Sequence, residues 1–198
     1  MKSILIELER VEKLIEKEPD FFIHQRFQTD MEWWVIGRTA RILSEINSSF
    51  PAFAEKTLVP DFRTLDVRRN EFNLIEVTEA LLPGRKRVEE YKKEKEITDW
   101  SHIEWESIDP IENPWITLIN CLNKKFSIKY PPHTWLIIYL NISYVYISEH
   151  GYWHQTLLAN AVQWNLGISS FERVLVLDST GKALVELFPK MVTIKPEI

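Results

Sequence analysis

The sequence predicts an α/β protein in which a mixed central sheet is flanked by helices. Apolar residues recur at helical spacing near the N-terminus, and uninterrupted apolar runs typical of buried strands occupy the middle of the chain. Helical and strand patterns then alternate toward the C-terminus, which favours helices packed on one sheet. At 198 residues the chain suits a single domain, with residues 1–28 as a helical N-terminal extension and residues 29–198 as the core.

The first two predicted elements are helices. From Ile4 to Ile15 apolar residues recur every 3 to 4 positions, and Pro19 ends this helix. A second helix is predicted to start at Thr29, because Thr29 and Glu32 have the spacing of a capping box. Its apolar stripe continues to Ile46.

An extended pattern follows the second helix. Residues 62–67 predict a first strand, residues 68–71 a turn and residues 72–81 a second strand. The second strand is apolar on both faces, which is typical of a strand in the middle of a covered sheet. Residues 83–97 predict an exposed charged helix, and residues 98–114 predict an acidic surface loop.

The second half of the chain continues the alternation of helices and strands. Asn113 and Pro114 favour a helix start, and the apolar side of that helix continues to Phe126. Residues 134–141 give the clearest buried-strand pattern. The remaining predicted elements are a strand at residues 144–147, a helix over residues 153–167 stopped by Gly167, and a hairpin of strands 172–178 and 182–188.

Composition limits the class of protein. The chain has eight Trp, spread along its length, and most are expected in the core. The single Cys121 excludes an internal disulfide and a cysteine metal cluster, which fits a reducing compartment. With only five Gly, the sequence contains no phosphate-binding glycine loop and no dinucleotide fingerprint. The net charge of −5 argues mildly against attraction of nucleic acid by the whole surface.

No segment predicts membrane insertion. Charges interrupt the N-terminal apolar residues, unlike the apolar core of a signal peptide. The longest apolar stretch, residues 135–147, is 13 residues long, whereas a spanning helix needs about 20. We therefore expect a soluble cytoplasmic protein without a membrane partner.

Two acids stand out in residues 60–78. Glu76 lies within an apolar strand, where a carboxylate must be paired, protonated, at a strand end or bound to a cation, and Asp61 follows Pro60. A turn between their two strands allows both side chains to meet at one end of the sheet. Carboxylate oxygens suit Mg²⁺. The alternative is that Asp61 caps a turn and Glu76 pairs with an Arg.

The arrangement of this region resembles the PD-(D/E)xK nuclease superfamily, which has the restriction-endonuclease-like fold. The resemblance covers roughly residues 29–141 and rests on "PDF", then "IEVTEA", a basic segment and a later buried strand. It implies that Asp61 and Glu76 bind Mg²⁺, with Glu32 as a further acid from the second helix. It also implies nucleic acid as the partner and phosphodiester hydrolysis as the reaction.

One position departs from that family. Thr78 stands where the family has a Lys that orients or activates the attacking water, and Thr can neither hold a positive charge nor accept a proton at neutral pH. A basic residue of the following segment, Lys86 or its neighbours Arg85 and Arg87, is a candidate replacement. Lys86 suits the role better, because Arg is effectively always protonated.

Basic residues around the two acids are predicted to contact phosphates. The alternative is that they are ordinary solvated charges. The predicted nucleic-acid-binding residues are Arg63, Arg68, Arg69, Arg85 and Arg87.

Other side-chain pairs suggest weaker sites. His150 and His154 have the spacing of zinc ligands on a helix, but Gly151 lies between them and no third ligand is suggested. Cys121 and His133 could form a nucleophile and a base, but Cys121 fits a small buried apolar residue better.

Three functional hypotheses follow from the sequence. The first is a Mg²⁺-dependent nuclease, and the second is a catalytically inactive binding protein with a nuclease fold. The third is an aromatic-rich protein-interaction module that uses Trp33, Trp100 and Trp105. Homo-oligomerisation stays open in all three.

Overall fold

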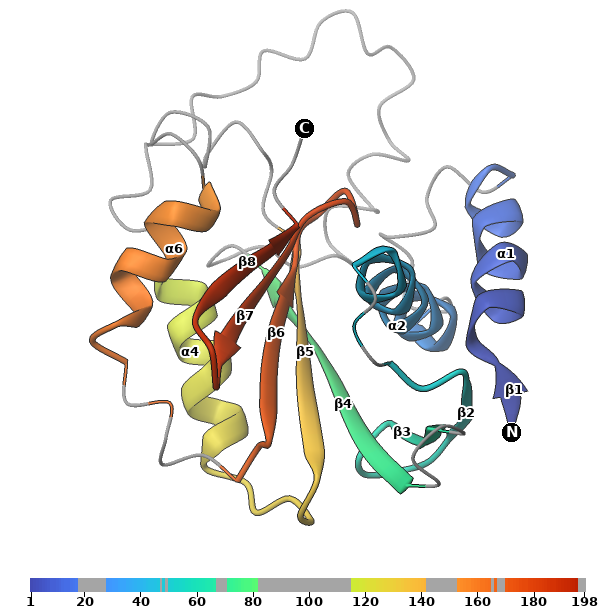
Figure 1. The fold of residues 1–198 in the computed structure, drawn as a ribbon, viewed down its shortest axis with the longest axis horizontal. Helices are drawn as coiled ribbons and strands as arrows, with labels where there is room; N and C mark the ends of the chain where they lie inside the picture. The colour runs from blue at the N-terminus through green and yellow to red at the C-terminus, as the bar shows by residue number, and fades with distance from the viewer. Residues whose placement is uncertain are drawn as a thin grey trace, which may run out of the picture.

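The chain folds around one mixed sheet that runs through the whole molecule (Figure 1). The computed structural model describes residues 1–17, 28–46, 48, 50–66, 71–81, 115–141, 153–164, 166 and 170–195. Within these residues the sheet has eight strands, ordered as they occur along the chain. The strands are β1 (Lys2–Ser3), β2 (Phe53–Lys56), β3 (Phe62–Asp66), β4 (Glu71–Leu81), β5 (Thr134–Asn141), β6 (Arg173–Leu177), β7 (Leu184–Phe188) and β8 (Val192–Lys195).

The sheet is antiparallel at both sides and parallel in the middle. Strands β1 to β4 pair antiparallel, as do β6 to β8. The three central strands β4, β5 and β6 pair parallel. Parallel neighbours need crossover connections, and α4 and α6 lie in them. The described helices are α1 (Ile4–Ile15), α2 (Gln28–Glu45), α4 (Ile116–Phe126) and α6 (Trp153–Ala161).

The helices cover opposite faces of the sheet. Helices α1 and α2 pack on one face and α4 and α6 on the other, as Figure 1 shows. Strand β4 illustrates the division, because Ile75 and Val77 join the core under α2 whereas Ala80 joins the core under α4. Successive residues of a strand point to opposite faces. Glu76 therefore points toward α4.

Helix α1 belongs to the core layer. Ile4, Leu8 and Val11 are fully buried, and α1 packs along α2. A Cβ atom at Gly37 of α2 would lie 2.7 Å from the Cβ of Leu8, so the absence of a side chain there allows the close approach of the two helices. The predicted N-terminal extension is thus one of the helices that cover the sheet.

The structure confirms the predicted class of mixed sheet and flanking helices, with corrections to individual elements. The capping box is wrong, because α2 already includes Gln28 and the Glu32 side chain contacts Lys56 of β2. Helix α6 ends at Ala161, where the amide of Trp164 bonds back to the Ala161 carbonyl in a tight turn. Strands β1, β2 and β8 were not predicted. The elements predicted at residues 83–97, 98–114 and 144–147 lie outside the described residues.

The Trp side chains fill the core where they are described. Trp33 is 4% exposed and packs edge-on against Phe62, so it cannot contribute to an interaction surface, and that part of the third hypothesis is wrong. The other two Trp residues proposed for that surface, Trp100 and Trp105, lie outside the described residues.

Candidate functional site

Asp61 comes just before β3 and approaches the backbone of β4 beside Glu76. The register of β3 and β4 pairs Phe62 with Ile75, so one further step along both strands brings Asp61 opposite Glu76. The regular pairing ends there, and the Val77 amide donates to the Asp61 Oδ2 atom at 2.9 Å instead of to a strand carbonyl. This bond fixes the Asp61 carboxylate at the backbone of β4, one residue after Glu76.

The turn between β2 and β3 brings Lys56 to Asp61. The Thr57 amide donates to the Asp61 carbonyl at 2.9 Å and closes the turn. Lys56, the residue before it, then reaches the Asp61 Oδ1 atom at 3.0 Å, and the same ammonium contacts the Glu32 Oε2 atom. Lys56 therefore bridges an acid of α2 and the acid that follows Pro60.

Glu76 has partners from α4 and the segment after it. Its Oε1 atom accepts hydrogen bonds from the Lys125 ammonium and from the Tyr130 hydroxyl, the latter at 3.1 Å. The Glu76 and Lys125 side chains are only 10% and 15% exposed. The buried Glu76 carboxylate is therefore paired with a Lys. The alternative interpretation of the sequence had paired it with an Arg.

The geometry of α4 explains how Lys125 reaches Glu76. The Thr78 Oγ1 atom lies 3.6 Å from the Cys121 Sγ atom, so α4 runs antiparallel to β4. Four residues of a helix rise about 6 Å, and two residues of a strand span about 6.6 Å. The four helix residues from Cys121 to Lys125 therefore cover about the same distance as the two strand residues from Thr78 back to Glu76. Lys125 thus reaches Glu76 just as Cys121 reaches Thr78.

The three acids and two lysines form one electrostatic cluster, the acid–lysine cluster, made of Glu32, Lys56, Asp61, Glu76 and Lys125. The negative charge of Asp61 acts on Glu32 on one side and on Lys125 on the other. The cluster has three carboxylates and two ammonium groups.

Lys125 is held in its charged form. Burial lowers the pKa of Lys125, but its hydrogen bond to Glu76 and the charges of Glu76 and Asp61 outweigh this and raise the pKa overall. A Lys with a raised pKa is protonated at neutral pH and cannot accept a proton from water. Burial likewise raises the pKa of Tyr130, with the charge of Glu76 adding to it, so its hydroxyl keeps its proton.

The surroundings of Glu32 favour its protonated, neutral form. Burial raises the pKa of Glu32, and although the hydrogen bond from Lys56 lowers it, the charge of Asp61 raises it again, with a net increase. The folded chain thus binds the Glu32 proton more tightly than the unfolded chain does. The stabilisation from this group is complete below the ordinary pKa of 4.5 and is lost as the pH rises through the raised value.

A Glu32→Gln variant should therefore gain stability relative to the wild type as the pH rises from about 4 to 7, because Gln does not ionise. Urea unfolding of both proteins in EDTA across this range measures the difference in unfolding free energy. Glu9→Gln, at an exposed acid of α1, is the control variant. A difference that stays constant with pH, or that changes in favour of the wild type, would contradict the raised pKa of Glu32.

The other predicted catalytic residues have different surroundings. Thr78 faces α4 and contacts Cys121. Burial raises the pKa of the Cys121 thiol, which does not favour a nucleophilic thiolate. His133 is exposed, pairs with Glu172 at 2.8 Å and precedes Thr134, which lies opposite Leu74 of β4. The Cys121–His133 pair is therefore wrong, because four strand residues, about 13 Å, separate Leu74 from Thr78.

The acids offer a two-carboxylate arrangement for a hard cation. Among the described residues no three His, Cys, Asp or Glu side chains gather as a metal cage. Glu32 is separated from Asp61 by the Lys56 ammonium, so the three predicted acids do not form a three-ligand set. Mg²⁺ usually takes only one or two carboxylates together with water and phosphate oxygens. Asp61 and Glu76 would supply two such carboxylates.

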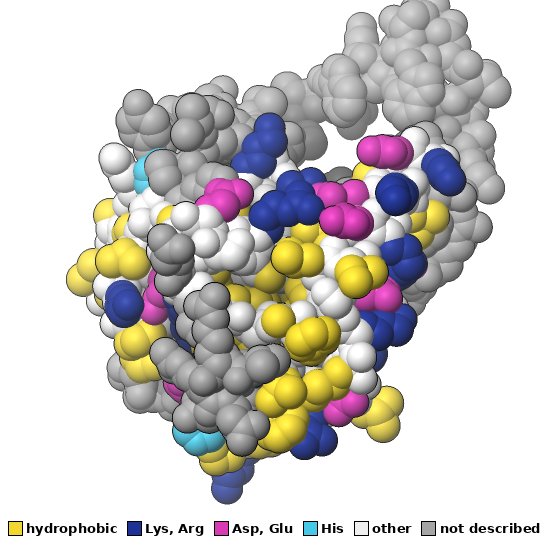
Figure 2. Space-filling model, turned by 45° about the vertical axis from the view of Figure 1, so that its right-hand side comes forward, with side chains coloured by type: hydrophobic (Ala, Val, Ile, Leu, Met, Phe, Trp, Pro, Cys, Tyr) yellow, Lys and Arg dark blue, Asp and Glu magenta, His cyan; other side chains and the backbone are white. Residues whose placement is uncertain are grey.

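Of the residues predicted to form a basic surface, only Arg63 lies within the described part of the chain. Arg63 is exposed on β3, pairs with Glu55 at 3.6 Å and stacks over the Phe72 ring. Figure 2 shows the side of the molecule that carries α1, where basic and acidic side chains alternate around a group of hydrophobic ones, so this face is not uniformly basic. The predicted residues Arg68, Arg69, Arg85, Lys86 and Arg87, and also His150, lie outside the described residues.

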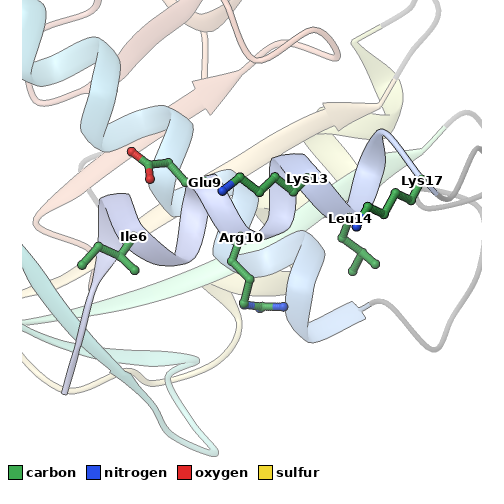
Figure 3. Close-up of a pocket in the computed structure, with 6 residues that line it drawn as sticks. All are labelled: Ile6, Glu9, Arg10, Lys13, Leu14 and Lys17. Atoms are coloured by element: carbon green, nitrogen blue, oxygen red, sulfur yellow. The ribbon is translucent and has the colours of Figure 1, made fainter.

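A surface hollow of about 460 Å³ lies away from the acid–lysine cluster. Figure 3 shows its six labelled side chains, which project from α1 and the turn after it. They combine basic groups with one acid and two apolar residues: Ile6, Glu9, Arg10, Lys13, Leu14 and Lys17. None of them belongs to the predicted site. His154, from the predicted zinc pair, is buried on α6, and burial lowers its pKa.

Two cluster residues, Lys56 and Lys125, were missed from the sequence, as was Tyr130, the further partner of Glu76. A signal existed for Lys125, because Leu118 and Leu122 are the buried residues of α4 and Lys125 continues their stripe at helical spacing. A Lys on an apolar stripe requires a buried partner, and Glu76 is that partner. Lys56 had no comparable signal, since β2 is only four residues long.

The chain matches no protein-family model, no curated protein and no solved structure in the comparisons made. No helix within the described ranges is long and apolar enough to cross a membrane. The fold and the site together define an α/β protein with a mixed eight-stranded sheet and an acid–lysine cluster on one half of it.

Proposed function

We propose that this protein hydrolyses phosphodiester bonds in nucleic acid with the help of a divalent metal ion. The observation that supports the proposal most is that Asp61, just before β3, accepts from the β4 amide that follows Glu76, and that Glu76 accepts from the Lys125 ammonium. The order of these elements agrees with the resemblance to restriction-endonuclease-like nucleases. In that resemblance an acid after Pro precedes a strand with a second acid, a helix and another buried strand.

Asp61 and Glu76 are the residues that would hold the ion. When bound, Mg²⁺ would polarise a phosphate oxygen and lower the pKa of a coordinated water. The Val77 amide orients the Asp61 carboxylate, and the Tyr130 hydroxyl orients the Glu76 carboxylate. Such supporting hydrogen bonds fix ligand geometry and tune ligand basicity.

In this proposal Lys125 has the role of the Lys that the nuclease family has at the position of Thr78. Thr78, at the family position, contacts Cys121 and has no charge to offer. Lys125 approaches Glu76 from α4 and is protonated, so its role is to place a positive charge near a phosphate oxygen and not to remove a proton from water. The candidate from the sequence, Lys86, lies outside the described residues.

A second candidate function is a nucleic-acid-binding protein of the same fold without turnover. One observation favours it: Asp61 and Glu76 already have ammonium partners. Lys56 contacts Asp61, and Lys125 contacts Glu76. Such a protein would bind without cutting.

The test is an incubation with labelled DNA and RNA, single- and double-stranded, in Mg²⁺, in Mn²⁺ and in EDTA. We expect cleavage that requires the divalent ion and that is lost in Asp61→Asn, which keeps a hydrogen-bond acceptor for Val77 but lacks the charge. Binding that weakens with salt, without cleavage under any condition, would support the second candidate. Neither cleavage nor binding would contradict both.

A further inference from the structure

Both acids proposed as metal ligands are already in contact with internal cations. The Glu76 Oε1 atom accepts from Lys125 and Tyr130, and the Asp61 Oδ1 atom accepts from Lys56 at 3.0 Å. A divalent ion that binds the Glu76 Oε1 atom would lie close to the Lys125 ammonium, and the two positive charges would repel each other. The ion and the ammonium therefore cannot both bind this oxygen in the same way.

The two lysines differ in how firmly they are held. Lys56 bridges two carboxylates, those of Glu32 and Asp61, and its ammonium also lies over the Phe62 ring. Lys125 contacts one carboxylate and lies in the last turn of α4. Its flexible four-carbon side chain lets the ammonium move while the helix stays in place. Displacement of Lys125 breaks one ion pair, whereas displacement of Lys56 breaks two.

We infer that Lys125 is a built-in counter-ion that competes with a divalent cation for Glu76. It holds the Glu76 carboxylate beside Asp61 until the cation binds, and the cation then displaces it. The freed ammonium stays at the edge of the site, where a phosphate oxygen is its next available partner. The inference rests on the proposed function for the identity of the cation, and it adds that the protein limits its own metal affinity.

Titration calorimetry with MgCl2 and with MnCl2, without nucleic acid, tests the competition. We compare the wild type with Lys125→Met, which removes the competing ammonium and keeps the aliphatic length. Lys124→Met is the matched control, because Lys124 is exposed, adjacent on α4 and loses the same charge. We expect Lys125→Met to bind the ion about 10-fold more tightly than the wild type, which is about 1.4 kcal/mol. Lys124→Met should change the affinity less than about 3-fold.

Unfolding measurements give a second readout that does not depend on activity. In EDTA, Lys125→Met should unfold at a lower temperature than the wild type, because Glu76 loses its counter-ion. Saturating Mg²⁺ should raise the unfolding temperature of Lys125→Met more than that of the wild type. If Lys125→Met does not fold, Lys125→Gln retains a hydrogen-bond donor for Glu76 and is measured in its place.

The outcomes separate this inference from the proposed function. Equal affinities for Lys125→Met and Lys124→Met would overturn the competition and leave the metal site intact. Metal binding by Lys125→Met but not by the wild type would support the competition and overturn hydrolysis by the wild type. If no variant binds either ion, both the competition and the metal-dependent function are overturned.

Discussion

Glu76→Gln should lower the rate of divalent-ion-dependent phosphodiester cleavage by at least about 100-fold. Loss of a hydrogen-bonding partner behind a metal ligand typically costs about 10- to 100-fold in metal affinity or activity, and loss of the ligand charge itself should cost at least the upper value. Gln keeps the size of Glu and an oxygen that accepts from Lys125 and Tyr130. The fold should therefore survive while the charge is removed.

The measurement is the initial cleavage rate of a labelled nucleic acid in Mg²⁺, with circular dichroism as a check of folding. The matched control is Glu55→Gln, which removes the same charge from an exposed acid of β2 on the same part of the sheet. That variant should keep the rate within about 3-fold, because exposed charges are screened by salt. If folded Glu76→Gln cleaves at the rate of the control, Glu76 has no role in the proposed cleavage.

Arg173→Met should destabilise the folded protein by about 3–5 kcal/mol, the range for a buried ion pair that loses one partner. The Arg173 Nη2 atom donates to the Glu186 Oε2 atom at 2.6 Å, and the two side chains are 12% and 3% exposed. Arg173 also lies over the Trp135 ring. Its loss leaves the Glu186 carboxylate buried between β6 and β7 without its cation.

Urea unfolding at neutral pH measures this effect. Arg173→Met/Glu186→Leu should recover most of the lost stability, because replacing both charges with apolar groups removes the unpaired carboxylate. Arg63→Met is the matched control, since the Arg63–Glu55 pair is exposed and should contribute less than about 1 kcal/mol. If Arg173→Met is no less stable than Arg63→Met, the buried pair contributes nothing to the fold.

The central elements of the fold were predictable because their patterns are strong. Residues 72–81 and 134–141 are apolar on both faces, and the structure places them as the paired central strands β4 and β5. The hairpin of β6 and β7 follows from two apolar runs around a Gly-containing turn. The short strands β1, β2 and β8 were missed because two to four residues give no measurable period.

The candidate site was partly predictable. Asp61 and Glu76 were found because a carboxylate within an apolar strand is unusual and because an acid follows Pro60 nearby. Their ammonium partners were not found: Lys125 is 49 residues from Glu76 in the sequence, and Lys56, 5 residues from Asp61, lies in a strand of only 4 residues. Local spacing carries no information about a contact as distant as that of Lys125 with Glu76.

The type of each strong element, the mixed sheet with flanking helices and the two acids that require partners all follow from the order of residues along the chain. Those properties depend on side-chain periodicity and on the cost of burying charge, which act locally along the chain. The identity of the cations that meet those acids depends instead on how the helices pack on the sheet. The antiparallel packing of α4 on β4 matches the helix rise to the strand rise and so brings Lys125, and not a residue near Thr78, to Glu76.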